Sequence, residues 1–337
     1  MKKSLMGLGL AIVLVAVLAT PGAAAIKLSF KLNGGAAMLL NGAGDLEKFR
    51  LGEQAYATDW AEGDAFSSTF SWKKMSLVSE FGGEAILHLT PKLGVGIGVG
   101  YISVGRKGNY TLNYHDSWYA SGGTFDEKED STTAHDFSGS AVPILLNFHF
   151  QTPLSPRFNL IGYAGIGYYM GKFNHDYNYT ANYVLTYTST IYWNQKGTVD
   201  VTYTQKSKAT CNKIGFQGGV GLEMLLTPMI SVGLEFTGRM VNFSDWKGDW
   251  EYDYSGRTRY WHEYLGWYSD TTTKFDDTES GSLWYWDSHW SYNNKDYASL
   301  GLREEKPSGS TVSNVRPAGI NLNRIGALLS VRFHFDI

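Results

Sequence analysis

The sequence lacks several features that would place the chain among common protein classes. Cys211 is the only cysteine in 337 residues, so no disulfide can form within the chain. Only 18% of the residues are charged and the net charge is −3, which argues against a basic surface for nucleic acid. After residue 25, no apolar run is long enough for a membrane-spanning helix. The remaining alternatives are a soluble chain and a chain that crosses a membrane with strands.

The first 25 residues have the features of a secretory signal peptide. Lys2 and Lys3 precede a short apolar stretch, and three alanines at 23–25 provide the small residues that signal cleavage requires. The apolar stretch is short for a transmembrane anchor. We therefore predict a signal peptide at 1–25 and one mature domain at 26–337.

Eight later segments alternate apolar residues with small or polar ones, which is typical of strands whose two faces meet different environments. In the clearest segment, Ile230, Val232 and Leu234 fall on one face, whereas Glu235 and Arg239 fall on the other. The segments are 26–40, 75–89, 93–101, 141–151, 158–170, 216–224, 230–240 and 324–337. An even number of strands of about ten residues each fits a bacterial transmembrane barrel.

The connections between these segments alternate strictly in length. Short connections at 90–92, 152–157 and 227–229 all contain Thr-Pro, and proline suits turns and strand starts. Long connections occupy 41–74, 106–139, 172–213 and 242–317. Outer-membrane barrels have short periplasmic turns and long extracellular loops. We therefore predict that both mature termini are periplasmic, with no further domain after the last strand.

Two segments carry a resemblance to a known family. Gly-Tyr-Ala-Gly-Ile-Gly-Tyr at 162–168 looks like a strand common in small outer-membrane barrels, and residues 331–337 are similar to the terminal strand that the barrel-assembly machinery recognises. The chain thus resembles the eight-stranded barrels of the outer-membrane protein A family over 26–337. The resemblance implies a closed antiparallel up-and-down barrel in the cell outer membrane, in contact with lipid and lipopolysaccharide. It also implies recognition by the assembly machinery through Phe333, Phe335 and Ile337, although the family usually ends in an aromatic residue.

The interior of an eight-stranded barrel is narrow enough for side chains to fill. The predicted lumen-facing charge network consists of Lys27, Lys31, Glu80, Glu84, His88, His149, Glu223, Glu235, Arg239, Arg324, Arg332 and His334. Because buried charges must be paired, these residues are predicted to form an ionic plug. The alternative is a narrow, porin-like diffusion channel for ions or small solutes.

The long connections hold most of the aromatic residues. Residues 183–203 are predicted to form a hairpin that turns at Asn194-Gln195-Lys196-Gly197. The last connection contains the candidate surface-binding residues Trp250, Tyr260, Trp261, Trp267, Trp284, Trp286 and Trp290. Two interpretations stay open: strands that continue above the membrane with cross-strand aromatic pairs, or a binding surface for a glycan or protein. A barrel of ten strands would follow if part of 250–300 crossed the membrane.

Motifs for catalysis and metal binding are missing. The chain has no nucleophile-elbow pattern, no His-Glu-x-x-His and no phosphate-binding loop, and Asp270, Asp276, Asp277 and Glu279 lack EF-hand spacing. His115 beside Ser117, and His289 beside Ser288, are interpreted as solvated loop residues. We therefore predict a non-enzymatic outer-membrane barrel with a structural or surface-interaction role, without cofactor or metal. A diffusion channel is the second hypothesis and a lipid-modifying enzyme the third.

Overall fold

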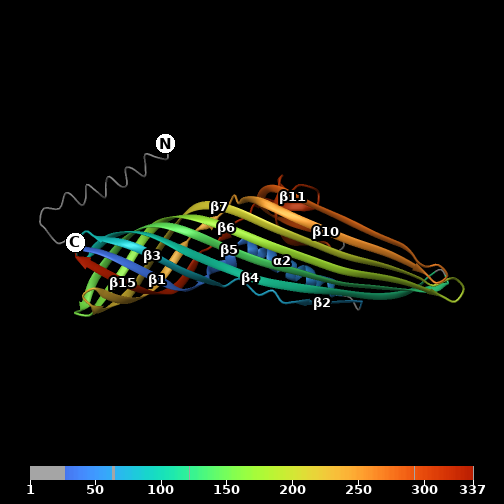
Figure 1. Ribbon diagram of the computed structural model, residues 1–337, viewed down its shortest axis with the longest axis horizontal. Coiled ribbons are helices and arrows are strands. Elements are labelled where there is room, and N and C mark those ends of the chain that lie inside the picture. Colours follow the sequence, from blue (N-terminus) through green and yellow to red (C-terminus); the bar gives the residue numbers. More distant parts are fainter. Residues whose placement is uncertain (1–26, 63–64, 121, 292, 337) are drawn as a thin grey trace.

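The computed structural model describes residues 27–62, 65–120, 122–291 and 293–336, so the predicted signal peptide and Ile337 lie outside the described residues. The molecule is elongated, and its long strands run along its length from the end that holds the C-terminus (Figure 1). Within the described ranges, no helix combines the length and the apolar character needed to cross a bilayer.

Among the described residues, the fold is all-β apart from one α-helix and one short 3-10 helix. The helices are η1 (Leu40–Ala43) and α2 (Asp45–Trp60). The strands are β1 (Lys27–Leu39), β2 (Phe66–Phe70), β3 (Leu77–His88), β4 (Leu93–Ala120), β5 (Gly123–Ser155), β6 (Phe158–Ser189), β7 (Gln195–Thr227), β8 (Ile230–Met240), β9 (Asn242–Phe243), β10 (Lys247–His262), β11 (Gly266–Trp290), β12 (Lys295–Arg303), β13 (Val312–Pro317), β14 (Ile320–Asn321) and β15 (Arg324–Asp336). Each of the eight segments predicted from the alternating pattern coincides with a strand over most of its described residues, although Leu40, Met75, Ser76 and Leu89 lie outside β1 and β3.

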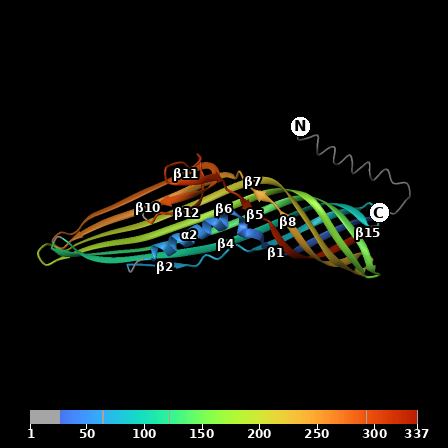
Figure 2. The same cartoon turned by 180° about the vertical axis from the view of Figure 1, so that it is seen from behind.

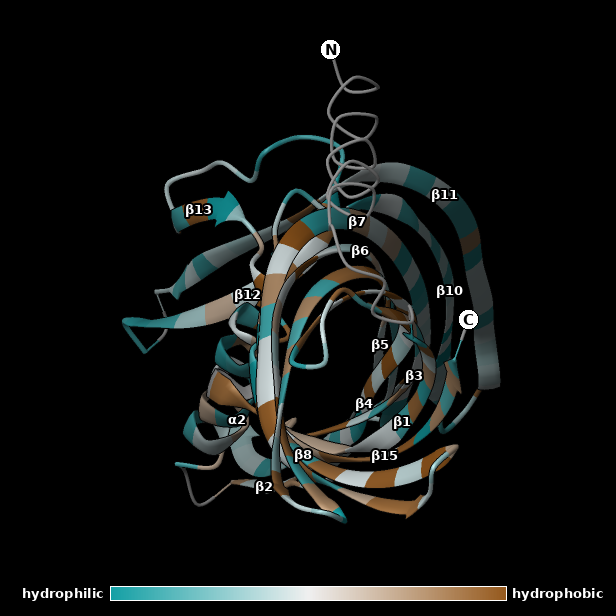
Figure 3. Ribbon diagram, turned by 90° about the vertical axis from the view of Figure 1, so that its left-hand side faces the viewer, coloured by the Kyte–Doolittle hydropathy of each residue, from teal (hydrophilic) through white to brown (hydrophobic). Residues whose placement is uncertain are grey.

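The main sheet has thirteen strands, more than the eight predicted. Eight of them pair antiparallel in a cyclic order, β1–β3–β4–β5–β6–β7–β8–β15, and β15 returns to β1. Viewed from the end that holds the C-terminus, these strands surround one axis (Figure 3). The additional strands, β2 and β10 to β13, arise from the segments predicted as the first and last long loops.

The prediction of long loops at 106–139 and 172–213 is wrong, because β4 to β7 continue through both segments. These four strands have 28 to 33 residues each. β6 and β7 pair without a register shift from Phe158 opposite Met224 to Tyr187 opposite Gln195. The interpretation in which strands continue above the predicted membrane segments is therefore confirmed.

The predicted hairpin at 183–203 exists, but its turn lies at 190–194 and Gly197 pairs with Leu185 inside the strand. Side chains close the turn at this place. The Ser189 hydroxyl accepts the N–H groups of Ile191 and Tyr192 at 3.1 and 2.9 Å, and the Asn194 side chain accepts the Ser189 N–H at 2.9 Å. Local hydrogen bonds of serine and asparagine thus replace the glycine turn expected from sequence.

β7 divides the molecule into two halves. Its residues 195–210 pair with β10, whereas residues 216–227 pair with β8. β10, and β11 beyond it, therefore extend only the half that lies away from the C-terminus, which we call the distal half (Figure 2). We call the other half, where the eight strands pair in a cycle, the cyclic half. Segment 250–300 lies beside the distal part of β7 and does not join the cycle.

The distal half has a concave face, against which α2 packs (Figure 2). Asp45 and Glu47 lie in the first helical turn, where carboxylates interact favourably with the helix dipole. Leu46, Phe49 and Ala57 are buried. Gly52 meets β12 so closely that a Cβ would lie 2.8 Å from the backbone N and O of Ala298. Sequence reasoning missed this helix, which lies in a segment predicted as loop.

Candidate functional site

The outward faces of the cyclic half carry exposed apolar side chains. They include Phe30, Leu32, Leu77, Phe81, Ile97, Val99, Phe148, Ile166, Phe216, Val220, Phe236 and Leu329. Hydrophobic residues alternate with others along these strands (Figure 3). Exposed apolar area of this extent is unusual on a monomeric soluble protein. The inward faces of the same strands bury most of the charged side chains of this half, together with a few apolar ones such as Ile86, Ile161 and Leu328. A soluble sandwich has the opposite arrangement, with apolar side chains inside and charged ones outside.

The polarity of the outward face changes part-way along unbroken strands. On β6, the outward residues Ile166, Tyr168 and Met170 are followed by Lys172 and Asn174. β5 changes at the same level, because Val142 pairs with Met170 and the next outward residue, Ser140, pairs with Lys172. The strands do not break here, so the change marks a boundary between two surroundings. We call this level the polarity boundary.

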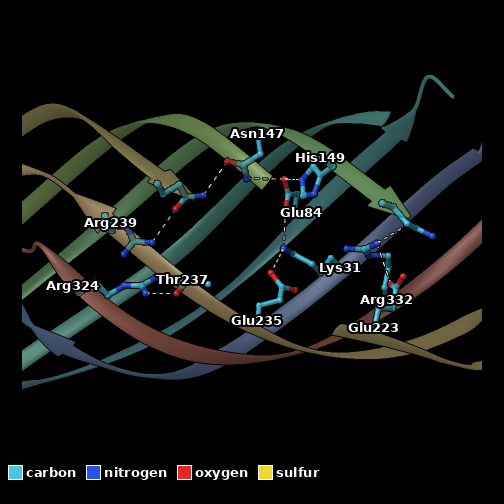
Figure 4. Close-up of polar contacts among 12 residues, drawn as sticks. Lys31, Glu84, Asn147, His149, Glu223, Glu235, Thr237, Arg239, Arg324 and Arg332 are labelled. Carbon is cyan, nitrogen blue, oxygen red and sulfur yellow. Dashed lines mark hydrogen bonds and ion pairs between the residues drawn. The ribbon is translucent and has the colours of Figure 1, made fainter. Parts of the chain in front are cut away.

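The middle of the inward face holds a buried lysine between two carboxylates (Figure 4). Lys31 Nζ lies 3.3 Å from Glu84 Oε2 and 3.2 Å from Glu235 Oε2. Glu84 Oε1 is also 2.7 Å from His149 Nε2 and accepts an N–H of Asn147 at 2.8 Å. Each charge is therefore paired and hydrogen-bonded, as burial requires.

A second cluster lies nearer the polarity boundary. Glu80 forms ion pairs with both Arg239 and Arg324, and all three side chains are buried. Arg324 also donates to the Thr237 hydroxyl at 2.5 Å, and the Arg239 guanidinium lies 5.4 Å from the ring centre of Tyr169. One carboxylate thus holds two guanidinium groups across the interior.

A third cluster lies toward the end where β1 begins and β15 ends. Arg332 Nη1 lies 3.1 Å from Glu223 Oε1, which also accepts the Ser231 hydroxyl at 2.7 Å. Ser231 Oγ is 2.9 Å from His334 Nε2. Ser29 Oγ then links His334 Nδ1 and His88 Nε2, at 3.0 and 2.8 Å.

Eleven of the twelve predicted lumen residues therefore belong to these three clusters. Lys27 does not: it is exposed, and its Nζ pairs with Asp336 Oδ1 at 3.2 Å, since it begins β1 at the open end of the cycle. The predicted charge network left out the uncharged members, which are Ser29, Asn147, Asn159, Gln217, Ser231 and Thr237. The alternating pattern places all of them except Asn159 on the inward face, and Asn159 lies in segment 158–170, whose facing the sequence leaves ambiguous.

An apolar core follows the ion pairs on the distal side. The next inward positions beyond Glu80 and Arg239 are Val78 and Val241, which are 1% and 2% exposed. They join a buried cluster that includes Leu46 of α2, Phe243 and Trp246. The interior of the cycle is thus filled by paired charges and then covered by apolar side chains.

A cavity of about 400 Å³ lies on the concave face of the distal half beside α2. α2 contributes Phe49 and Glu53 to its lining. The remaining lining residues are His135, His175, Tyr177, Tyr203, Gln205, Trp250, Tyr252, Glu279, Trp286, Ser299, Leu300, Gly301, Leu302 and Arg303. Aromatic faces and separated polar groups therefore line one cavity, a composition common in ligand sites.

Two histidines form the most buried polar group of this cavity. His135 Nδ1 lies 3.0 Å from His175 Nε2, and His135 Nε2 lies 3.8 Å from Glu53 Oε2. Burial, together with the nearby charge of His135, holds the pKa of His175 well below its usual range. His175 is therefore neutral at neutral pH. On the adjacent strands, Tyr203 and Tyr252 stack with ring centres 6.3 Å apart.

No protein-family model matches this sequence, and no curated protein matches it. A major outer membrane protein from Thermus thermophilus is similar in structure, with 14% identity, coverage of 92% of this chain and 99% of that chain, and a TM-score of 0.26. The outer membrane protease OmpT from Escherichia coli has 12% identity, coverage of 94% and 99%, and a TM-score of 0.29. Likenesses this distant assign no role to any residue of this chain, and the resemblance to the outer-membrane protein A family stays a prediction.

The seven predicted surface aromatics do not form one surface. Trp250 is only 4% exposed and lines the cavity together with Trp286, and Trp284 is half-buried in β11. Trp290 packs against Tyr56 of α2, with ring centres 5.3 Å apart. The others, Tyr260, Trp261 and Trp267, lie near the β10–β11 turn. β10 and β11 thus distribute these residues between the cavity, α2 and the turn, and their binding role stays a prediction.

The histidines and acidic residues considered for chemistry have other partners. His115 Nε2 lies 2.6 Å from Asp126 Oδ1, and His289 Nδ1 lies 2.9 Å from Asp296 Oδ1. Asp270 pairs with Arg257 at 2.5 Å. Among the residues that the structure describes, no three or more His, Cys, Asp or Glu side chains are grouped for a metal ion.

Proposed function

We propose that this chain is a non-enzymatic integral protein of the outer membrane. The cyclic half is a closed eight-stranded transmembrane barrel, and the distal half stands above the membrane outside the cell. The reversal of polarity along unbroken strands carries this proposal. Apolar side chains face outward below the boundary, where lipid would surround them, and polar side chains face outward above it, where water would.

The barrel is proposed to be closed to solutes, as an ionic plug rather than a diffusion channel. Four buried carboxylates, Glu80, Glu84, Glu223 and Glu235, balance four buried bases, Lys31, Arg239, Arg324 and Arg332. Opening a water-filled path would separate these pairs and also displace the apolar core above them. The paired charges and the apolar core together therefore support the closed form.

Planar-bilayer recording of the purified full-length protein tests this proposal. We expect heat-modifiable migration on gels, recovery in the outer-membrane fraction, and no regular conductance steps. Glu80→Ala with Glu235→Ala, which removes carboxylates from two clusters, serves as a comparison in which leakage is expected to appear. Regular conductance of the unmodified protein would contradict the plug, whereas recovery as a soluble protein would contradict the membrane assignment itself.

A surface-binding role is proposed for the cavity beside α2, with an extracellular glycan as its ligand. Sugars present apolar C–H faces and many hydroxyls. Tyr203, Tyr252 and Trp286 offer ring faces, while Glu53 and Glu279 offer hydrogen-bond acceptors around the same space. The lining hydroxyl of Ser299 hydrogen-bonds to Ser288 at 3.0 Å, which fits binding better than nucleophilic chemistry.

Binding of the detergent-solubilised protein to a glycan array tests the cavity. We expect retention on a defined glycan subset, with Trp286→Ala reducing it about tenfold or more, because stacking and burial of one ring are lost. Trp118→Ala is the matched control, since Trp118 is a partly exposed tryptophan that neither lines the cavity nor contacts α2. Equal losses in both variants, or an array without any retention, would count against a glycan ligand.

Assembly is proposed to involve the terminal strand β15, as its resemblance to the assembly signal implies. Phe335 is 41% exposed on the outward face and packs edge-on against Phe30, with ring centres 5.8 Å apart. Phe333 lies two residues earlier in β15, whereas Ile337 lies outside the described residues.

A further inference from the structure

Three hairpin turns end together at the far end of the distal half (Figure 1). They join β4 to β5, β6 to β7 and β10 to β11. The large apolar and aromatic residues at these turns are Trp118, Tyr119, Ile191, Tyr192, Trp193, Tyr264, Leu265, Trp267 and Tyr268. We call this set the distal tip. None of its residues belongs to the cavity beside α2 or to the interior of the barrel.

Direct contacts hold the three turns together as one surface. The Asn194 N–H donates to Glu263 Oε2 at 3.0 Å, and the Glu263 N–H donates to the Asn194 carbonyl at 2.9 Å. The rings of Trp193 and Tyr264 lie 5.6 Å apart. The Ser189 hydroxyl donates to the Gly122 carbonyl at 3.1 Å, which joins the first turn to the second.

The tip is more exposed than a soluble protein usually leaves such residues. Tyr119, Ile191 and Tyr264 are 74%, 73% and 76% exposed, and every other member of the distal tip is at least 40% exposed. Gly122 and Gly266 have φ values of 77° and 69°, which allow the tight turns that leave these side chains at the apex. Exposed apolar patches of this kind mark contacts with proteins or membranes.

The composition of the tip favours a lipid surface over a protein. Tryptophan and tyrosine have an apolar body with a polar edge, and they concentrate at membrane–water interfaces. The charged groups at the turns are held by contacts within the tip: Glu263 Oε2 accepts the Asn194 N–H at 3.0 Å, and the Arg259 guanidinium lies 5.2 Å from the ring centre of Trp267. Charged groups behind it are paired laterally, as in Arg259 with Asp200 at 3.2 Å and Arg257 with Asp270 at 2.5 Å. With its charged groups paired or hydrogen-bonded, such a surface matches zwitterionic headgroups, which carry no net charge.

The tip is too far from the polarity boundary to touch the bilayer that holds the barrel. β6 passes from Met170 at the boundary to Ser189 beside the tip, a length of about 60 Å at roughly 3.3 Å per residue. Over this length the long strands lead away from the cyclic half and its exposed apolar side chains (Figure 1). A lipid surface in contact with the tip must therefore be a second one.

We propose that the distal tip inserts its aromatic and aliphatic side chains into the interface of a second lipid bilayer, so that the protein bridges two membranes. This inference rests on the proposed transmembrane barrel, because the second bilayer is defined relative to the first. Insertion would move the apolar parts of several side chains out of water at once, while the tyrosine hydroxyl and tryptophan N–H groups stay at headgroup level.

The test uses the full-length protein in nanodiscs, mixed with vesicles of pure phosphatidylcholine and separated by flotation. Incorporation into nanodiscs tests the barrel, and flotation with vesicles then tests the tip, so the two failures are distinguishable. We expect the loaded nanodiscs to float with vesicles. Leu265→Ser should weaken this several-fold, and Ile191→Ser with Leu265→Ser at least about tenfold, since exposed aliphatic area is lost.

Leu51→Ser is the matched control, because Leu51 is an exposed leucine on α2 away from the tip, and it should leave flotation unchanged. A polarity-sensitive probe on Ile191→Cys provides a second measurement, since the natural thiol of Cys211 is buried. Its emission should shift to the blue when vesicles are added. Nanodiscs that do not float, that pair with one another without vesicles, or that lose flotation equally in the control would overturn the proposal.

Discussion

The cyclic and distal halves use the same strands but bury opposite kinds of side chain. Along β6, the cyclic half turns Ile166 and Tyr168 outward, whereas the distal half turns Asn174 and Asn178 outward and keeps Phe173 buried. The backbone pairing does not change between the halves. A continuous antiparallel ladder therefore places no requirement on which face is apolar, and the surroundings of each half determine it.

The two halves also differ in how their interiors are stabilised. The cyclic half encloses ion pairs such as Lys31 with Glu84 and Glu235, while the distal half encloses a conventional apolar core around α2. Outside, the cyclic half exposes apolar side chains that would contact lipid. Lipid contact gives no driving force for clustering apolar groups inside, so a polar interior is the stable complement there.

The largest expected effect compares a buried lysine with an exposed one. Lys31→Met should destabilise the barrel by about 3–5 kcal/mol, because Glu84 and Glu235 lose the cation between them. Lys48→Met on α2 removes an exposed lysine 3.4 Å from Asp45 and should cost about 1 kcal/mol or less. Urea unfolding followed by heat-modifiable gel migration measures both.

A companion variant separates charge from packing at the same site. Lys31→Met with Glu235→Gln removes one carboxylate together with the lysine, and it should recover a large part of the lost stability. Equal midpoints for Lys31→Met and Lys48→Met would show that the interior of the cyclic half tolerates unpaired charge. The contrast between the two interiors would then be wrong.

The next effect tests the polarity boundary on one strand. Ile166→Arg and Asn178→Arg place the same charge on the outward face of β6, below and above the boundary. In lipid, Ile166→Arg should cost about 2–4 kcal/mol, whereas Asn178→Arg should stay within about 0.5 kcal/mol as a surface change. Refolding into phosphatidylcholine vesicles measures the difference, and similar costs at both positions would mean that lipid does not surround the cyclic half.

Much of the cyclic half could be predicted from sequence, because each strand there has two unlike faces. The period of two in 230–240 placed Glu235 and Arg239 inside, and the Thr-Pro pairs at 90–91 and 227–228 marked two turns at one end, whereas Thr152 and Pro153 lie inside β5 and pair with β6. In both of these turns a threonine hydroxyl accepts following N–H groups, as Thr90 does for Leu93 and Thr227 does for Ile230, at 3.0 Å each. Local sequence patterns are therefore sufficient to predict strands and turns where the two faces of each strand meet unlike surroundings.

The distal half could be predicted far less well. Its strands carry Thr, Tyr and Asn on both faces, so the period of two is weak and β4 to β7 looked like loops beyond the boundary. α2 has few apolar residues, and Gly52 makes its close contact with β12, more than 240 positions later in the chain, rather than within the helix. The cavity likewise depends on β10, β11 and β12 meeting β6 and β7, which no local pattern specifies.

The last prediction concerns the contact between Asp45 and Arg316, which helps to hold α2 to the distal half. Burial alone would raise the pKa of Asp45, but hydrogen bonds from Arg316 and the Gly319 N–H, with the charges of Arg316 and Lys48, lower it below its usual value. The Gly319 N–H lies 2.8 Å from Asp45 Oδ2. Asp45→Asn should therefore cost about 2 kcal/mol at pH 7, since a charged hydrogen-bonded pair is lost. Hydrogen exchange of the α2 amides measures this cost.

The lowered pKa of Asp45 also predicts how the stability of α2 changes with pH. Because the pKa of Asp45 is lower in the folded state, its contribution is fully present above the unfolded value of about 3.9 and is lost as the pH falls further, through the lowered folded value. Protection of α2 should therefore fall in acid for the natural chain, while Asp45→Asn should start lower and depend less on pH. The cluster around Lys31 lies in the cyclic half, away from Asp45. The exchange of β1 amides should therefore be the same in the natural chain and in Asp45→Asn. Parallel acid profiles for α2 in both proteins would mean that Asp45 does not hold the helix through its charge.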